Sequence, residues 1–129
     1  MTESLSLTQD ERGVSRITLN RPDVHNAFNE ELINALDDAI TAVTDNDAVR
    51  VVVIAGNGKS FSAGADLNWM KRTADYDFAE NSADALRFGL MLGRLASMPK
   101  PVVGIIQGPA YGGGVGLVSA CDIAIAGEA

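Results

Sequence analysis

The sequence predicts an α/β fold in which most strands of a central sheet run parallel. Residues 51–54 form a continuous run of β-branched side chains, and residues 102–106 form a second apolar run. Such runs are typical of strands that are covered on both faces, as in a parallel sheet. Segments with helical spacing separate the strands, and this alternation of strands with helices favours a largely parallel core.

The first third of the chain predicts a hairpin followed by an amphipathic helix. Residues 3–9 and 14–20 are predicted strands joined by a turn, and Pro22 ends the second one because it cannot donate a ladder hydrogen bond. Asn29 is predicted to cap a helix that runs to about Thr44. Four apolar residues should bury one face of this helix: Leu32, Leu36, Ile40 and Val43.

Two further helices are predicted in the middle of the chain. A short one should start near Asp66. Asp77 and Glu80 stand three residues apart, as in a capping box, before a long helix that Pro99 closes. The apolar residues predicted to face inward from the long helix are Phe78, Leu86, Leu90 and Leu95.

Length, charge and cysteine content restrict the class of protein. The 129 residues, 47% of them hydrophobic, suit one globular unit. A net charge of −7 without a basic run argues against nucleic-acid binding, which needs clustered Lys and Arg. No apolar run reaches the roughly 20 residues of a membrane helix. The single cysteine, Cys121, excludes an intrachain disulfide and a cysteine-built metal site. Without a signal-peptide pattern at the start, we expect a cytoplasmic location.

Two glycine-containing segments each follow a predicted core strand and precede a helix. The first covers residues 56–67, and the second covers residues 108–114, before a short helix over residues 115–120 and a strand that starts at Ile123. Ligands bind at this carboxyl edge of α/β sheets, where small residues admit a ligand and helix N-termini direct N–H groups at negative charge. If the two loops meet, their N–H groups could form an oxyanion hole.

Each loop taken alone has a plainer interpretation, since glycines at strand-to-helix turns are often only turn residues. Neither loop carries a nucleotide motif. The second lacks the Gly-Lys-Ser/Thr ending of a P-loop, and no Gly-x-Gly-x-x-Gly follows the first strand. Nucleotide chemistry therefore has little support.

Three motifs together resemble the crotonase (enoyl-CoA hydratase/isomerase) family. They are Phe61-Ser62-Ala63-Gly64-Ala65-Asp66-Leu67, the segment from Pro101 to Gly114 with Cys121-Asp122, and Asn20-Arg21-Pro22 with Asn26-Ala27-Phe28-Asn29. The resemblance covers essentially the whole chain. Residues 65–70, with Gly116-Leu117, look most like bacterial methylglutaconyl-CoA hydratases.

The resemblance implies a role for individual residues. The backbone N–H groups of Ala65 and Gly113 correspond to the donors that bind the thioester oxygen in the family. The residues that correspond to the CoA-binding region are Val24, His25, Ala27, Ala63, Gly64, Asp66, Leu67 and Gly112. His25 is the only histidine, but it belongs to this CoA-contact segment and is not expected beside the oxyanion loops, so we favour binding over catalysis.

Other polar residues keep two interpretations. Asp66 could be a catalytic acid, although its place at a helix start favours capping. Trp69 could line the acyl pocket or pack in the core. Cys121 is expected to be a buried small hydrophobe. Three cations could meet CoA phosphates, although solvated surface charge is the favoured interpretation: Lys59, Lys71 and Arg72.

The chain departs from the family pattern at one position of the second loop. Many family hydratases carry a glutamate where this chain has Gly116, although the methylglutaconyl-type relatives also have glycine there. The resemblance places a second family glutamate a few residues beyond Ala129. We therefore expect residues 1–129 to be the N-terminal part of a single crotonase-type ββα spiral domain, lacking its C-terminal helices and inactive alone.

The sequence thus predicts a lyase that adds water to a branched short-chain enoyl-CoA, with 3-methylglutaconyl-CoA as the candidate substrate. CoA enters as part of the substrate, and no cofactor or metal is expected. The resemblance implies a homotrimer or a dimer of trimers when full length. Two alternatives stay open: an isomerase or decarboxylase on the same scaffold, and a truncated CoA-binding remnant without catalytic activity.

Overall fold

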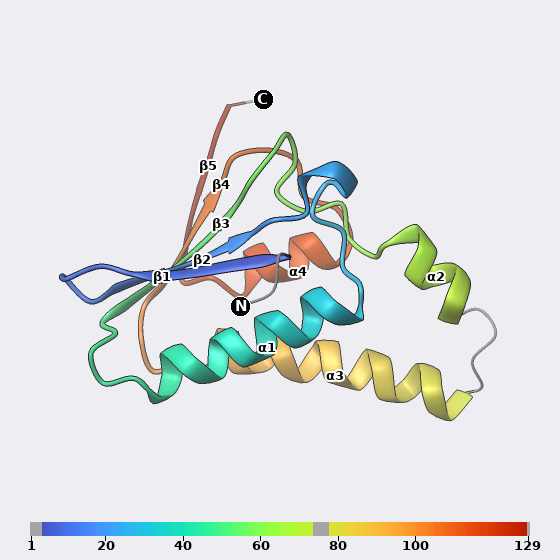
Figure 1. Cartoon of the computed structure of the whole chain (residues 1–129), viewed down its shortest axis with the longest axis horizontal. Coiled ribbons are helices and arrows are strands. Elements are labelled where there is room, and N and C mark those ends of the chain that lie inside the picture. Colours follow the sequence, from blue (N-terminus) through green and yellow to red (C-terminus); the bar gives the residue numbers. More distant parts are fainter. Residues whose placement is uncertain (1–3, 74–77, 129) are drawn as a thin grey trace.

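A five-stranded sheet in the order β1-β2-β3-β4-β5 forms the frame of the chain (Figure 1). The computed structural model describes residues 4–73 and 78–128. The elements are β1 (Leu5–Gln9), β2 (Val14–Leu19), the 3-10 turn η1 (Pro22–Val24), α1 (Glu30–Asp45), β3 (Val51–Gly56), α2 (Leu67–Thr73), α3 (Phe78–Ala96), β4 (Val102–Ile106), α4 (Gly113–Ser119) and β5 (Ile123–Ala126). Helices α1, α3 and α4 lie on one side of the sheet.

The sheet has one antiparallel edge and a parallel core. β1 pairs antiparallel with β2, and the carboxylate of Asp10 shapes the turn by accepting the N–H groups of Arg12 at 2.9 Å and Val14 at 3.1 Å. The pairs β2–β3, β3–β4 and β4–β5 are parallel. At the start of β5, Asp122 accepts the Val102 N–H at 2.8 Å, which aligns β5 with β4. The predicted fold class is confirmed.

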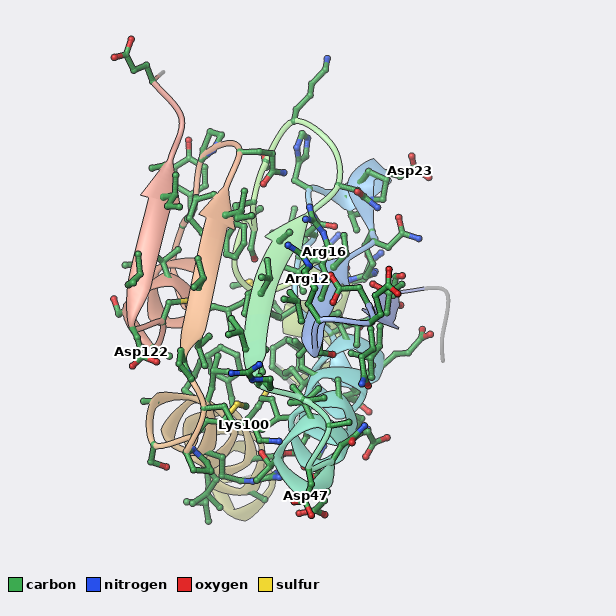
Figure 2. The ribbon with its side chains drawn as sticks, turned by 90° about the vertical axis from the view of Figure 1, so that its left-hand side faces the viewer. Arg12, Arg16, Asp23, Asp47, Lys100 and Asp122 are labelled. Carbon is green, nitrogen blue, oxygen red and sulfur yellow. The ribbon has the colours of Figure 1, made fainter. Side chains whose placement is uncertain are left out.

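Helix α1 forms where its capping signals predict. The Asn29 side chain accepts the Leu32 N–H at 2.9 Å, and all four residues of the predicted inward face are buried. Lys100 closes the other end, because its Nζ donates to the carbonyls of Val43 at 2.5 Å and Asn46 at 2.6 Å. Figure 2 shows Lys100 between the start of β4 and the helices. A cation at a helix C-terminus satisfies free carbonyls and opposes the helix dipole.

The inward face of α3 differs from the prediction. Leu95 is buried as expected, but Leu86 and Leu90 are 61% and 58% exposed. Among the residues of α3 whose burial is described, the buried or half-buried large apolar ones are Phe88, Met91, Leu92 and Leu95, and Met98 is buried just after the helix. Their spacing follows one helical stripe, whereas Leu86 and Leu90 project from another stripe of the same helix. The predicted Asp77–Glu80 capping box and the Phe78 side chain lie outside the described residues.

The sheet is covered on only one face by the described elements, which corrects the expectation of strands covered on both. In β3, Val52 and Ile54 are buried, while Val51 and Val53 are half-buried. Farther along the same open face, the side chains of Ile105, Ile123 and Ile125 are exposed. The apolar run in β3 therefore does not imply two covered faces within this chain. None of the helices in the described ranges is long and apolar enough to cross a membrane.

Candidate active site

The two glycine loops lie at the carboxyl edge of the sheet, as predicted, and they meet there, which is the condition for a shared oxyanion hole. The Phe61 N–H donates to the Pro109 carbonyl at 2.9 Å, and the Tyr111 N–H donates to the Ser62 carbonyl at 2.9 Å. Gly64 has a φ of +87°, and a Cβ placed there would lie 2.9 Å from the Tyr111 carbonyl oxygen. Only glycine suits this conformation and this close approach. Figure 1 shows the two loops beside the η1 turn.

The second loop is shorter than predicted, because α4 begins at Gly113 rather than at residue 115. Glycine is a poor helix former, so its presence indicated loop. The structure gives a different reason for Gly114: a Cβ there would lie 2.7 Å from the Ser62 carbonyl oxygen. Close contact between the helix and the first loop thus requires glycine in the first turn. Because α4 begins at Gly113, the N–H of Gly113 lies at the N-terminus of this helix.

The N–H groups of Ala65 and Gly113 have no hydrogen-bond acceptor within the described part of the chain, and the N–H of Gly112 has none there either. The residues on both sides of Ala65, and the residue after Gly113, are paired. The Gly64 N–H donates to Ser62 Oγ at 3.3 Å, the Asp66 N–H to the Phe28 carbonyl at 2.7 Å, and the Gly114 N–H to the Tyr111 carbonyl at 2.8 Å. Ala65 on the first loop, and Gly112 and Gly113 on the second, therefore leave N–H donors for a ligand where the two loops touch.

A parallel bridge between Phe28 and Ala65 sets the direction of the first free donor. Phe28 pairs with both neighbours of Ala65, since its N–H donates to the Gly64 carbonyl at 2.6 Å and its carbonyl accepts the Asp66 N–H. In such a pairing the middle residue directs its own N–H away from the partner backbone. The Ala65 N–H therefore points away from the Phe28 backbone.

Two aromatic rings pack against the second donor residue. A Cβ at Gly113 would lie 2.9 Å from Phe88 Cζ and 3.2 Å from the Phe28 ring, so a side chain at residue 113 would displace them. The two rings pack with centroids 5.1 Å apart at an angle of 58°. Gly116 lies farther along α4, where a Cβ would approach Leu92 Cδ1 to 3.0 Å. Apolar side chains of α3 thus line this side of the loops.

A pocket of about 530 Å³ opens beside the first loop and holds most of the predicted binding residues. It is lined by Val24, His25, Ala27, Ala63, Ala65, Asp66, Leu67, Asn68 and Lys71. Gly64, Gly112 and Gly113 do not line it; they lie where the two loops touch. Sequence reasoning did not select Asn68, and it took Lys71 as surface charge. Both residues lie in the first turns of α2, after the cap at Asp66, and this position in the predicted helix could have identified them from the sequence.

With this geometry in place, comparisons with known proteins decide the family. The sequence model described as "Enoyl-CoA hydratase/isomerase" matches residues 9–129. The chain belongs to this family, the crotonase family.

Its relatives include proteins that are named for different reactions. The chain is 37% identical over 126 residues to a crotonyl-CoA hydratase of Syntrophomonas wolfei, covering 96% of this chain and 46% of that protein. It is 36% identical over 121 residues to the 1,2-epoxyphenylacetyl-CoA isomerase of Escherichia coli, with 93% and 46% covered. A solved enoyl-CoA hydratase from Shewanella pealeana matches with a TM-score of 0.93 and 41% identity, covering 95% of this chain and 46% of that one. The chain spans about half the length of the curated relatives it matches.

In this crotonase-family chain, His25 lies against the first loop, which corrects our expectation that it would lie apart from the oxyanion loops. Its carbonyl accepts the Ala63 N–H at 2.9 Å, and its Nδ1 lies 3.0 Å from Ser60 Oγ. His25 and Asn26 both have a φ of 55°, so the chain reverses sharply here. This tertiary contact is not visible in the sequence, because 35 residues separate the imidazole from Ser60.

Asp66 is a helix cap, as predicted, and it is also half of a part-buried ion pair. Its carboxylate accepts the N–H groups of Asn68 at 2.8 Å and Trp69 at 3.1 Å, and it pairs with Arg21 at 3.1 Å. Burial by itself raises the pKa of Asp66, but the Trp69 N–H, the Arg21 guanidinium and the Asn68 N–H together lower the pKa below its usual value of 3.8. Asp66 is therefore ionised at neutral pH and is no store of protons.

The surroundings of the remaining candidates, Trp69, Cys121 and Lys59, do not point to catalysis. Trp69 is half-buried against the core, and its Nε1 has no hydrogen-bond partner within the described residues. Cys121 is half-buried, and burial together with the neighbouring Asp122 raises its thiol pKa to about 11. Lys59 is exposed. Among the described residues, no group of His, Cys, Asp or Glu side chains could hold a metal ion.

Proposed function

We propose that the full-length protein is an enoyl-CoA hydratase that adds water to an α,β-unsaturated acyl-CoA thioester. One observation carries this proposal: the N–H groups of Ala65 and Gly113 lack acceptors at the junction of the two loops. Addition of water to such a thioester passes through an enolate-like state. Fixed donors aimed at the oxygen stabilise the negative charge as it develops, and removing one such donor typically lowers the rate by about 100- to 1,000-fold.

The pocket beside the first loop suits the CoA part of the substrate. Ala63 and Ala65 have small side chains, so an extended chain can lie against the loop backbone. Lys71 and His25 line the same pocket, and a cation there would attract the negative charge of a phosphate. The carbonyl of a thioester bound along this loop would come to the Ala65 N–H.

Proton transfer needs groups beyond those identified in the described residues. Gly116 carries no side chain, and the Asp66 carboxylate is engaged by Arg21 and by the start of α2. We propose that a glutamate in the rest of the full-length protein moves the protons, because general acids and bases contribute about 100- to 10,000-fold. That larger protein is proposed to be a homotrimer or a dimer of trimers.

We propose 3-methylglutaconyl-CoA as the substrate, on the likeness of residues 65–70 and of Gly116-Leu117 to the methylglutaconyl-type members. An isomerase is the second candidate, because a 36% identical relative is named 1,2-epoxyphenylacetyl-CoA isomerase. Hydration and double-bond isomerisation of an enoyl-CoA both pass through an enolate-like state, so the acyl group and the proton carriers discriminate between them.

The test is a substrate panel with the full-length protein. Hydration is followed as the loss of enoyl-thioester absorbance with 3-methylglutaconyl-CoA and crotonyl-CoA. Isomerisation is followed as the gain of that absorbance from a 3-enoyl-CoA. We expect the highest kcat/KM for hydration of 3-methylglutaconyl-CoA. A preference for crotonyl-CoA would contradict 3-methylglutaconyl-CoA as the substrate. Isomerisation faster than hydration would favour the isomerase. If no thioester is turned over, the proposed function is wrong.

A further inference from the structure

We propose that Arg21 is a positioning residue that fixes the direction of the Ala65 N–H, acting through Asp66 and Ala27. The inference rests on the proposed function, because it assigns the origin of the oxyanion geometry. Arg21 lies outside both glycine loops, immediately before η1. Arg21 contacts the first loop only in the folded chain, because 45 residues separate it from Asp66.

The guanidinium of Arg21 joins the two segments that flank the Ala65 donor. One nitrogen donates to the Ala27 carbonyl, and the other donates to the Asp66 carboxylate at 3.1 Å. The pair is shielded from solvent, since the side chains of Arg21 and Asp66 are 18% and 9% exposed. An ion pair in such a site is screened little by salt. The planar fork of arginine can serve two acceptors at fixed angles, which a lysine ammonium does not reproduce.

The backbone of Arg21 is held by the same turn. Its N–H donates to Asn26 Oδ1 at 2.7 Å, and its carbonyl accepts the Asn26 N–H at 2.8 Å. Asn26 is fully buried and donates onward to the carbonyls of Asn57 at 2.8 Å and Ser60 at 3.1 Å, both in the first loop. Arg21 therefore has little freedom to move relative to that loop.

Asp66 carries this constraint to its neighbour Ala65. The Asp66 N–H is fixed on the Phe28 carbonyl, and its carboxylate is fixed on Arg21 and on the first turn of α2. The residue after the donor is thus held through both backbone and side chain. Without the guanidinium, the carboxylate keeps only its N–H partners in α2, and the Ala27 carbonyl loses the Arg21 donor. The Gly64–Ala65 peptide stays hydrogen-bonded to Phe28 through the Gly64 carbonyl, so we expect the Phe28–Ala65 bridge to shift as a unit once Ala27 and Asp66 are no longer tied to Arg21.

The experiment compares Arg21→Gln and Arg21→Lys with wild type in the full-length protein. Arg12→Gln is the matched control, because it breaks an arginine–aspartate pair of 2.7 Å that is exposed at the hairpin turn (Figure 2). We measure kcat and KM for hydration and the thermal unfolding midpoint. The infrared carbonyl stretch of bound butyryl-CoA, labelled with carbon-13 at the carbonyl, reports hydrogen bonding to the thioester oxygen without turnover.

For Arg21→Gln we expect kcat to fall by about 10- to 100-fold, the range for a misplaced catalytic geometry. KM should change by less than about threefold, because ground-state binding is mostly elsewhere. The carbonyl stretch of the bound thioester should move towards its value in water. Arg21→Lys should recover part of kcat through its charge, and Arg12→Gln should match wild type.

Two results overturn the inference while leaving the proposed function intact. One is a wild-type kcat in folded Arg21→Gln. The other is a kcat that falls only with the folded fraction, while the carbonyl stretch keeps its wild-type frequency. Should Arg21→Gln fail to fold, the same two readings on Arg21→Lys decide. If the wild-type protein neither hydrates the thioester nor shifts its carbonyl stretch, the proposed function itself is wrong, and the inference falls with it.

Discussion

Gly64 lies directly against Tyr111, and this contact joins the two glycine loops. A Cβ at residue 64 would lie 2.9 Å from the Tyr111 carbonyl oxygen, and the Gly64 φ of +87° is one that side chains rarely adopt. The contact involves backbone on both sides, so a flexible side chain cannot move aside to relieve it. The separation of the loops, and with it the distance between the Ala65 and Gly113 N–H groups, depends on this glycine.

Gly64→Ala should therefore lower both stability and activity. Strain at a positive φ alone amounts to about 1–3 kcal/mol, and the clash with the Tyr111 carbonyl adds to it. Urea unfolding measures the loss. Gly93→Ala is the matched control, because nothing lies within 4 Å of a Cβ there and α3 is helical. The control should gain about 0.5–1 kcal/mol. Equal stability of the two variants would show that the loops are not joined as described.

Gly113→Pro should lower the hydration rate of the full-length protein by at least about 100-fold, since it removes one oxyanion donor. Proline is accommodated at the first position of a helix, but its ring would also press on Phe88. Gly113→Ala controls for this pressure, because it adds a Cβ and keeps the N–H. We expect the proline variant to be much slower than the alanine variant. Equal rates would mean that sterics, not the N–H, explain the loss.

Asp66 should stabilise the fold only while it is ionised. Its pKa is lowered from 3.8, so its contribution is complete above that value and is lost as the pH falls through the folded-state pKa. Asp66→Asn should therefore be less stable than wild type by about 1–3 kcal/mol at neutral pH. The difference should shrink as the pH falls below 3.8.

The measurement for Asp66 is urea unfolding across this pH range. Asp38→Asn, on the exposed face of α1, is the control and should show little difference from wild type at any pH. A gap between wild type and Asp66→Asn that stays constant from neutral to acid pH would show that the charge of Asp66 is not what stabilises the loop.

Local signals in the sequence were sufficient to predict most of the helices, strands and loops. Asn29 and Asp66 are both followed by helices that their side chains cap, because capping acts over two or three residues. The two glycine loops were placed by the strands before them. The rule that ligands bind at the carboxyl ends of parallel strands placed both loops at that edge of the sheet, whereas their contact is seen only in the structure.

Features that depend on tertiary contacts were not predictable. The inward stripe of α3 passes through Phe88 rather than Leu90, and apolar residues on two stripes of one helix leave this choice to packing. The position of His25 depends on Asn26, which donates across 34 residues to Ser60. The start of α4 at Gly113 depends on the contact of Gly114 with Ser62, which overrides the poor helix propensity of glycine.

Residues 1–129 alone should not hydrate an enoyl-CoA at a useful rate. Gly116 cannot carry a proton, and the Asp66 carboxylate is held by Arg21. Exposed apolar side chains on α3 and β5, such as Leu90 and Ile125, should also promote association. The check is turnover of 3-methylglutaconyl-CoA by the purified chain beside the full-length protein. Activity within about tenfold of the full-length protein would contradict the need for further proton-transfer residues.

The most direct test of the oxyanion assignment is a crystal structure of the full-length protein with a bound acyl-CoA that cannot turn over, such as butyryl-CoA. We predict that the thioester carbonyl oxygen lies within about 3 Å of the backbone nitrogens of both Ala65 and Gly113, with the pantetheine chain along Ala63. A carbonyl oxygen bound away from either nitrogen, in a complex with an ordered ligand, would contradict it.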